Sequence, residues 1–158
     1  MMDLDIRLWR QKDLPAIREL LSELVEVTHG PEPDLSLDHL TEIFGHMERF
    51  TDFYLNLVAT CEGDIAGFLS IVFYRSLFHR AGTALVSELV VGRRHRDRGV
   101  GRMLIERAKE EAQSRGLDEL EVSTETDNQD ARTFYRRCGF DEEHVLLGME
   151  FGSGANEE

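Results

Sequence analysis

Residues 89–102 read LVVGRRHRDRGVGR: the end of an apolar strand, a glycine-bearing turn and, from Val100, the amphipathic pattern of a helix. The N–H groups in the first turn of a helix have no partner within the helix, and the helix dipole adds positive potential there. Gly99 and Gly101 let a bulky anion approach the backbone. Five arginines lie between positions 93 and 102 of an otherwise acidic chain. The pattern therefore predicts a pyrophosphate site, the alternative being an ordinary strand–turn–helix with solvated arginines.

Two common phosphate-binding loops are excluded. A P-loop needs a lysine followed by serine or threonine, and the chain contains no such pair. The dinucleotide pattern GxGxxG fails because Leu104 stands where the third glycine belongs. A nucleotide triphosphatase is therefore disfavoured.

Composition limits the remaining classes. The 158 residues are 41% hydrophobic, enough for the core of one domain, and 18 basic against 31 acidic side chains give a net charge of −13. This charge argues against nucleic acid as a partner. The apolar stretch 65–74 is too short to span a membrane, and residues 1–10 lack an export-signal pattern. Cys61 and Cys138 form no CxxC pair, so we expect no disulfide framework, no cysteine zinc site and a cytoplasmic location.

The residues before the turn predict strands and two helices. Residues 4–9 alternate as in a half-buried strand, with Leu4, Ile6 and Leu8 on one side and Trp9 on the other. One amphipathic helix follows Asp13 and ends before Gly30, and Ser36 caps a second. The strands predicted next cover residues 54–60, 64–74 and 83–91, the first two forming a β-hairpin.

The residues after the turn continue the alternation of helix and strand. A helix begins at Val100 and ends at Gly116, and a short helix begins after Asn128 and ends at Gly139. Strands are predicted at residues 119–124 and 144–151. We therefore expect one mixed α/β (α+β) domain over residues 1–151, with a disordered polar tail at 152–158.

Two motifs in this frame resemble the GNAT superfamily of N-acetyltransferases. The family's acetyl-CoA loop has Gln or Arg, then Gly three positions later and Gly or Ala two further on, matched here by Arg96, Gly99 and Gly101. The second family element, Asn-x-x-Ala with an aromatic–Tyr pair and Gly-Phe, is matched by Asn128, Ala131, Phe134, Tyr135, Gly139 and Phe140. Spanning roughly residues 3–151, the resemblance implies a central mixed, mostly antiparallel sheet of about six or seven strands, a splayed V between two parallel strands, and about four flanking helices.

The resemblance also implies acetyl-CoA as co-substrate and a role for each motif residue. Backbone groups of Leu89, Val90 and Val91 would line the pantetheine arm and polarise the acetyl carbonyl. The loop residues that would hold the pyrophosphate are Arg96, Asp97, Arg98, Gly99, Val100, Gly101 and Arg102. Asn128 would hydrogen-bond the cofactor arm, or serve only as a helix N-cap. Tyr135 would give a proton to the departing sulfur, or is only a core aromatic residue.

A base is needed because a free alkylamine has a pKa of about 10.4. Glu88 stands where relatives often carry a carboxylate, and the alternatives are a water chain as base and a solvated glutamate. Ser123 stands where relatives that acetylate protein N-termini commonly carry a carboxylate, which weakens that interpretation. His39, Glu42 and His46 share a helix face but lack the spacing of helical zinc ligands, so we expect no metal; they could instead face the acceptor pocket.

These features predict an N-acetyltransferase that moves acetyl from acetyl-CoA to a primary amine by direct attack in a ternary complex. The alternative is a non-catalytic acyl-CoA-binding or sensing module of the same fold. The acidic surface favours a small-molecule or peptide acceptor that is cationic, such as a polyamine, an aminoglycoside-like amine or a lysine-rich peptide. The loop 76–80 either borders the acceptor pocket or is an ordinary hairpin tip. We expect no membrane or nucleic-acid partner, and the resemblance implies a homodimer paired through the last strands or the hairpin region.

Overall fold

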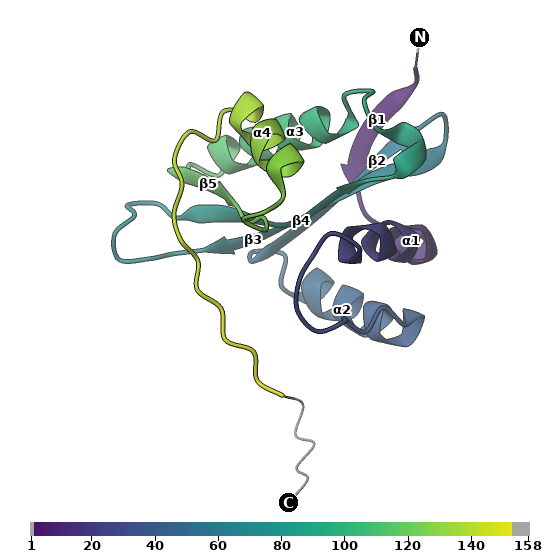
Figure 1. Cartoon of the computed structure of the whole chain (residues 1–158), viewed down its shortest axis with the longest axis horizontal. Helices are drawn as coiled ribbons and strands as arrows, with labels where there is room; N and C mark the ends of the chain where they lie inside the picture. Colours follow the sequence, from purple (N-terminus) through teal and green to yellow (C-terminus); the bar gives the residue numbers. More distant parts are fainter. Residues whose placement is uncertain (1, 153–158) are drawn as a thin grey trace, which may run out of the picture.

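The computed structural model describes residues 2–152 and has two helices on each face of one mixed sheet (Figure 1). Its strands run in the order β1 (Leu4–Leu8), β2 (Tyr54–Cys61), β3 (Asp64–Tyr74), β4 (Thr83–Val91) and β5 (Glu119–Val122). The helices are α1 (Leu14–Val25), α2 (Leu37–Arg49), α3 (Val100–Ser114) and α4 (Gln129–Cys138), with 3₁₀ turns at Gln11–Asp13 and Arg93–His95. The predicted α/β class and four helices are confirmed.

Each face of the sheet has its own apolar core. Successive strand residues point to opposite faces, so neighbours such as Leu57 and Val58 contribute to different cores. Leu57 packs with Leu104 of α3, whereas Val58 packs with Ile17 of α1. The sheet thus separates a compartment under α1 and α2 from one under α3 and α4.

The helix ends follow the predicted local chemistry. Pro15 lies in the first turn of α1, where its missing N–H costs nothing. The Ser36 hydroxyl accepts a hydrogen bond from the His39 amide at 3.2 Å and begins α2. Gly139, with φ of 109°, ends α4 in a left-handed cap.

β4 and β5 form the splayed pair of parallel strands that the resemblance implied. Their pairing begins at Thr83 with Glu119 and stops at Val86 with Val122, although β4 continues to Val91. An extra residue in β4, Ser87, lies immediately after the last pair, because Ser70 pairs with Glu88 while Ile71 pairs with Val86. Such a β-bulge bends the strand that carries it. We infer that the bulge is what separates β4 from β5.

The predicted strand 144–151 is not part of the sheet, which has five strands in the described residues rather than about six or seven. This segment leaves α4 and runs away from the sheet (Figure 1). Val145, Leu147 and Met149 are 78–87% exposed. Alternation alone does not make a strand without a neighbouring strand to supply hydrogen bonds. Of the predicted tail, residues 153–158 lie outside the described residues.

The end of β1 also differs from the prediction. Leu8 is exposed, whereas Trp9, predicted on the polar side, is buried against Phe44 and Phe68. The indole Nε1 of Trp9 donates a hydrogen bond to Glu48 Oε1 at 2.6 Å. Trp9 still follows the alternation, since Leu4 and Ile6 pack against the core under α3 and Trp9 packs in the core under α1. The difference is that helices cover the second face of the strand as well.

Candidate active site

The N-terminus of α3 forms one half of the candidate site. Gly99 is the N-cap with φ of 83°, a left-handed conformation that glycine adopts without strain, and no side chain caps the helix. The first-turn amides that follow have no acceptor within the helix. Arg96 Nε donates to the Val91 carbonyl at 3.3 Å, which holds the turn against the end of β4. The structure thus brings together the loop residues 96–102 and the strand residues 89–91.

The second predicted motif packs against this helix start. A Cβ at Gly101 would lie 3.1 Å from Phe134 Cζ, so α4 packs tightly on α3 and a side chain at this position would push the Phe134 ring aside. Tyr135 is half-buried, with its ring 5.3 Å from that of Phe134 and 5.7 Å from that of Phe140. Burial raises the pKa of Tyr135 to about 12, and its phenol is therefore protonated at neutral pH.

Asn128 caps α4. Its Oδ1 accepts a hydrogen bond from the Ala131 amide at 3.1 Å, the structural role that the sequence left open. Just before it, Asp127 contacts the His29 ring at 2.9 Å, and Glu125 accepts from the His29 amide at 3.0 Å. These contacts join the loop after α1 to the loop before α4.

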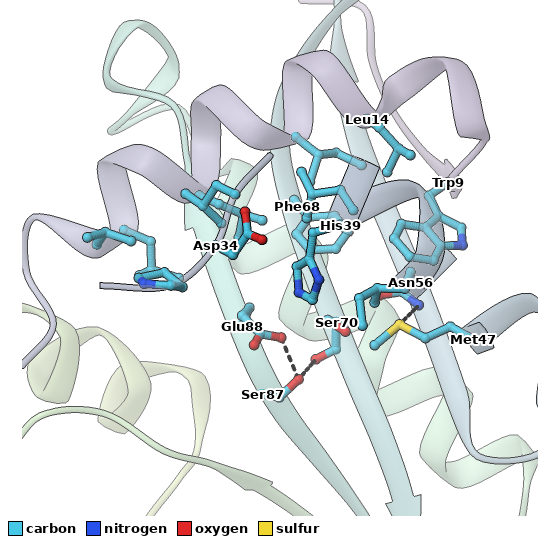
Figure 2. Close-up of a pocket in the computed structure, with 18 of the residues that line it drawn as sticks. Trp9, Leu14, Asp34, His39, Met47, Asn56, Phe68, Ser70, Ser87 and Glu88 are labelled. Carbon is cyan, nitrogen blue, oxygen red and sulfur yellow. Dashed lines mark hydrogen bonds between the residues drawn. The ribbon is translucent and has the colours of Figure 1, made fainter. Parts of the chain in front are cut away.

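A cavity of about 370 Å³ lies on the other face of the sheet, beneath α1 and α2 (Figure 2). Its walls are mainly apolar and include Trp9, Leu14, Ile17, Leu40, Met47 and Phe68. Its polar lining includes Asp34, His39, Asn56, Ser70, Ser87 and Glu88. Among the described residues that line it, there is no lysine or arginine.

Three of these polar residues form a row across the sheet. Asn56 of β2 pairs with Ser70 of β3, which pairs with Glu88 of β4, so all three side chains share one face. Asn56 is 4% and Ser70 is 2% exposed, and Asn56 Oδ1 and Ser70 Oγ have no hydrogen-bond partner among the described residues. The Ser87 hydroxyl lies 2.7 Å from Glu88 Oε2 (Figure 2).

The bulge at Ser87 points Glu88 into this cavity. Val86 packs in the core under α3, and in an unbroken strand Glu88, two residues later, would share that face. Beyond the extra residue the alternation is reversed, since Val90 packs in the core under α1 and Glu88 lines the cavity. Sequence reasoning selected Glu88 but missed Asn56 and Ser70, whose signal was a polar residue within an apolar strand.

The remaining candidates divide between the cavity and other places. His39 lines the cavity, whereas the His46 ring lies 5.0 Å from Phe50 and 5.8 Å from Tyr54. In the described part of the chain, no group of three or more His, Cys, Asp or Glu residues is placed to hold a metal ion.

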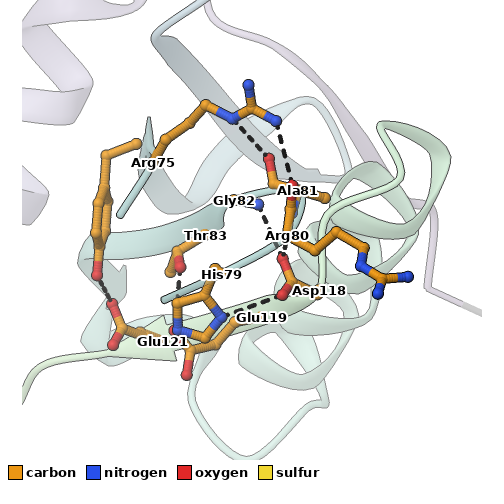
Figure 3. Close-up of polar contacts among 10 residues, drawn as sticks. Arg75, His79, Arg80, Ala81, Gly82, Thr83, Asp118, Glu119 and Glu121 are labelled. Atoms are coloured by element: carbon orange, nitrogen blue, oxygen red, sulfur yellow. Dashed lines mark hydrogen bonds and ion pairs between the residues drawn. The ribbon is translucent and has the colours of Figure 1, made fainter. Parts of the chain in front are cut away.

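The hairpin loop 75–82 is held at the start of β5 and does not line the cavity (Figure 3). The Asp118 carboxylate accepts from the Gly82 amide at 2.8 Å and lies 3.1 Å from His79 Nδ1. Hydrogen bonding, chiefly from Gly82, lowers the pKa of Asp118 to about 2. This cluster ties the β3–β4 hairpin to β5, and Figure 3 shows Arg75 bonded to the same loop through Ala81.

Comparisons with known proteins agree with this arrangement. The model of the GNAT acetyltransferase family matches residues 14–140, which is most of the chain. The fold and this match define an acyltransferase. The chain belongs to the GNAT family of acetyltransferases.

Individual relatives share between about a quarter and a third of the aligned residues with this chain. The chain is 32% identical over 87 residues to an aminoalkylphosphonate N-acetyltransferase of Salmonella typhimurium, an alignment that spans 55% of this chain and only 56% of that protein. It is 26% identical over 141 residues to glucosamine 6-phosphate N-acetyltransferase 1 of Oryza sativa, covering 82% of this chain and 84% of that protein. A transcriptional regulator from Bacillus halodurans shares the fold, with a TM-score of 0.82, 24% identity and coverage of 94% and 99%. The helices of the described residues include none with the length and apolar character needed to cross a membrane.

Proposed function

We propose that this acetyltransferase moves an acetyl group from acetyl-CoA to a primary amine bound in the cavity beneath α1 and α2. The observation that carries the proposal is the position of Glu88 between that cavity and the splayed end of β4. Acetyl-CoA supplies the acetyl group as a thioester. The amides after Gly99 and the exposed arginines Arg96, Arg98 and Arg102 would hold its pyrophosphate, and Asn128 and backbone groups of 89–91 its arm.

In this proposal Glu88 is the base. Its carboxylate takes a proton from the amine as the nitrogen–carbon bond forms and the carbon–sulfur bond breaks. Backbone N–H groups of β4 beyond Val86, where pairing with β5 stops, stabilise the carbonyl oxygen. Tyr135 packs against the core on the opposite face of the sheet from the cavity. Glu88 therefore acts on the amine from one face, and Tyr135 acts on the sulfur from the other.

Tyr135 acts in this proposal as a hydrogen-bond donor to the departing sulfur. A thiol has an ordinary pKa of about 8.5, below the value of about 12 for the Tyr135 phenol. The phenol therefore holds its proton more tightly than the thiolate would. This comparison favours donation of a hydrogen bond over complete transfer of the proton.

Direct attack, without an acetylated enzyme, is supported by both cysteines. Cys61 and Cys138 are buried, and burial raises the pKa of the Cys138 thiol. Initial rates with both substrates varied should therefore give intersecting lines in double-reciprocal plots. Parallel lines, or an acetyl group on either cysteine after mixing with acetyl-CoA alone, would contradict the direct route. Two free cysteines also fit the reducing cytoplasm that we propose as the location.

The test of function is thiol release from acetyl-CoA in the presence of primary amines. Glu88→Gln is expected to lower kcat/KM by about 10²–10⁴, and Tyr135→Phe to lower kcat with little change in the KM for the amine. Matched controls are Glu110→Gln, on the exposed face of α3, and Tyr74→Phe, whose phenol contacts Glu121 on the sheet. Wild-type rates in either active-site variant would refute that residue's role. Failure of every amine to release thiol would refute the transfer.

We also propose a homodimer in which residues 144–151 add a strand to β5 of a second copy. Val145, Leu147, Met149 and Phe151 alternate along the exposed segment, and β5 is an edge of the sheet in the described residues. Light scattering should then give twice the chain mass of 18.1 kDa. Leu147→Asp should give monomers, whereas Leu77→Asp, at a leucine in the hairpin loop that is even more exposed, should not. The opposite pattern would assign the dimer to the hairpin.

A further inference from the structure

The polar row on the cavity floor is built like a binding site for a ligand. Buried polar atoms in proteins nearly always have a hydrogen-bond partner. Asn56 Oδ1 and Ser70 Oγ have none among the described residues, although each side chain is more than nine-tenths buried. They belong to directly paired residues and face the same cavity as Glu88 (Figure 2). Two adjacent unpaired groups at such a position indicate that a ligand supplies the missing hydrogen bonds.

The chemistry of the row selects a nitrogen that donates hydrogen bonds. Asn56 Nδ2 already donates to Met47 Sδ at 3.4 Å, which leaves the acceptor Oδ1 for the ligand. The Glu88 carboxylate is an acceptor when ionised, and the Ser70 hydroxyl can accept or donate. A primary ammonium group carries three N–H donors and matches three such oxygens. Loss of one proton from the bound ammonium to solvent gives the neutral amine, and Glu88 takes the second proton from the same nitrogen as it attacks the thioester.

The same lining disfavours an anionic acceptor. Asp34 and Glu88 are its acidic residues, and no lysine or arginine accompanies them among the described lining residues. A phosphate or phosphonate there would lose its hydration and gain no lysine or arginine in return. The cavity therefore differs from one made for phosphorylated amines.

The walls select the rest of the ligand. Trp9, Leu14, Ile17 and Phe68 present apolar surface above the row. A volume of about 370 Å³ is near the small end for ligand cavities. The exposed Asp34 is the one further acidic group of the described lining, so a second ammonium group or several hydroxyls held against the apolar walls would be buried without partners. A flat or branched apolar body has no such cost.

We propose that the acceptor is a small primary amine with an aryl or branched alkyl body and no anionic group or second ammonium, and that Asn56, Ser70 and Glu88 bind its nitrogen. This inference rests on the proposed function, because it assigns the substrate class of the same cavity. This substrate class is narrower than the cationic acceptors that the acidic surface favoured, and it leaves out polyamines and aminoglycosides.

The test compares three amines on the full chain. Thiol release is measured with phenethylamine, aminoethylphosphonate and putrescine, and binding is followed without acetyl-CoA through the fluorescence of Trp9, the one tryptophan. Phenethylamine should bind, and its kcat/KM should exceed the other two by about tenfold or more. Asn56→Leu and Ser70→Ala should each raise its KM and its Kd by about tenfold, with the KM for acetyl-CoA unchanged. Ser114→Ala, on α3 across the sheet, is the matched control.

The outcomes separate this inference from the proposed function. Preferred turnover of aminoethylphosphonate or putrescine would overturn the substrate class while leaving amine acetylation intact. Binding of phenethylamine that weakens in the Asn56 and Ser70 variants, without thiol release, would support the pocket chemistry and refute the transfer. Unchanged KM and Kd in both variants, with unchanged thermal unfolding, would overturn the role of the row.

Discussion

Ser70→Ala should make the protein more stable and the enzyme worse. Ser70 is fully enclosed in the middle of β3, and its hydroxyl has no partner among the described residues. No protein group among the described residues replaces the hydration that this hydroxyl loses on folding. Alanine removes that loss without removing a contact that the folded protein uses.

The size of the effect follows from the burial. A buried polar group without a partner costs about 1–3 kcal/mol. Removal of one oxygen atom gives up a few dispersion contacts of about 0.1–0.2 kcal/mol each. We therefore expect the free energy of unfolding to rise by about 1–2 kcal/mol, and Tm by about 2–4 °C for each kcal/mol at this chain length.

Urea unfolding followed by Trp9 fluorescence measures this change, since Trp9 is buried between Phe44 and Phe68. Ser87→Ala is the control one strand away, because the Ser87 hydroxyl is already paired with Glu88 at 2.7 Å. That variant should be neutral or less stable. A loss of stability in Ser70→Ala would show that its hydroxyl has a partner in the folded protein, and would refute the reasoning.

Three further predictions concern the turn and two surface contacts. Gly99→Ala forces a side chain into φ of 83° and should cost about 1–2 kcal/mol in urea unfolding, with weaker acetyl-CoA binding by calorimetry. The hydrogen bond to Asp127 raises the pKa of His29 above 6.5, so this contact stabilises the fold below pH 6.5 and its contribution is lost as the pH rises through the folded-state pKa. His29→Gln should remove this pH dependence of the free energy of unfolding, measured by urea unfolding at a series of pH values above 6.5. The pKa of Asp118 is lowered to about 2 from 3.8, so its contacts stabilise the fold fully above pH 3.8 and this contribution is lost as the pH falls to about 2. Asp118→Asn should remove this loss of stability, measured by urea unfolding between those two pH values.

Much of the fold could be predicted because its signals are local. The Ser36 cap, Pro15 and Gly139 each set a helix end through contacts within a few residues. Apolar runs bounded by turn residues located β2, β3 and β4 for the same reason. Local patterns could not predict the contact between Phe134 of α4 and Gly101 of α3, because the two residues are far apart in the sequence. Only the family motifs marked both residues.

The floor of the cavity lay beyond sequence reasoning because it depends on strand register. Asn56 and Ser70 are fourteen positions apart and each interrupts an apolar run. Only the pairing of β2 with β3 shows that the two interruptions meet. The strand predicted at 144–151 was wrong for the opposite reason: its alternation is clear, but no neighbouring strand among the described residues pairs with it. Local pattern describes a strand's faces, whereas pairing decides whether the strand exists.

The bulge at Ser87 shows how much one extra residue controls. It is placed where pairing between β4 and β5 ends, so the same backbone bend opens the strands and leaves the backbone groups of 89–91 that point away from β3 without a strand partner among the described residues. It also reverses the alternation, which moves Glu88 from the face of Val86 to the cavity. In a regular strand Glu88 would lie in the apolar core under α3, and the splay would be filled by a continued ladder. The proposed base and the proposed acetyl site therefore both depend on this one bulge. Perfect alternation along β4 would place Glu88 on the wrong face of the sheet, and the sequence alone does not reveal the bulge.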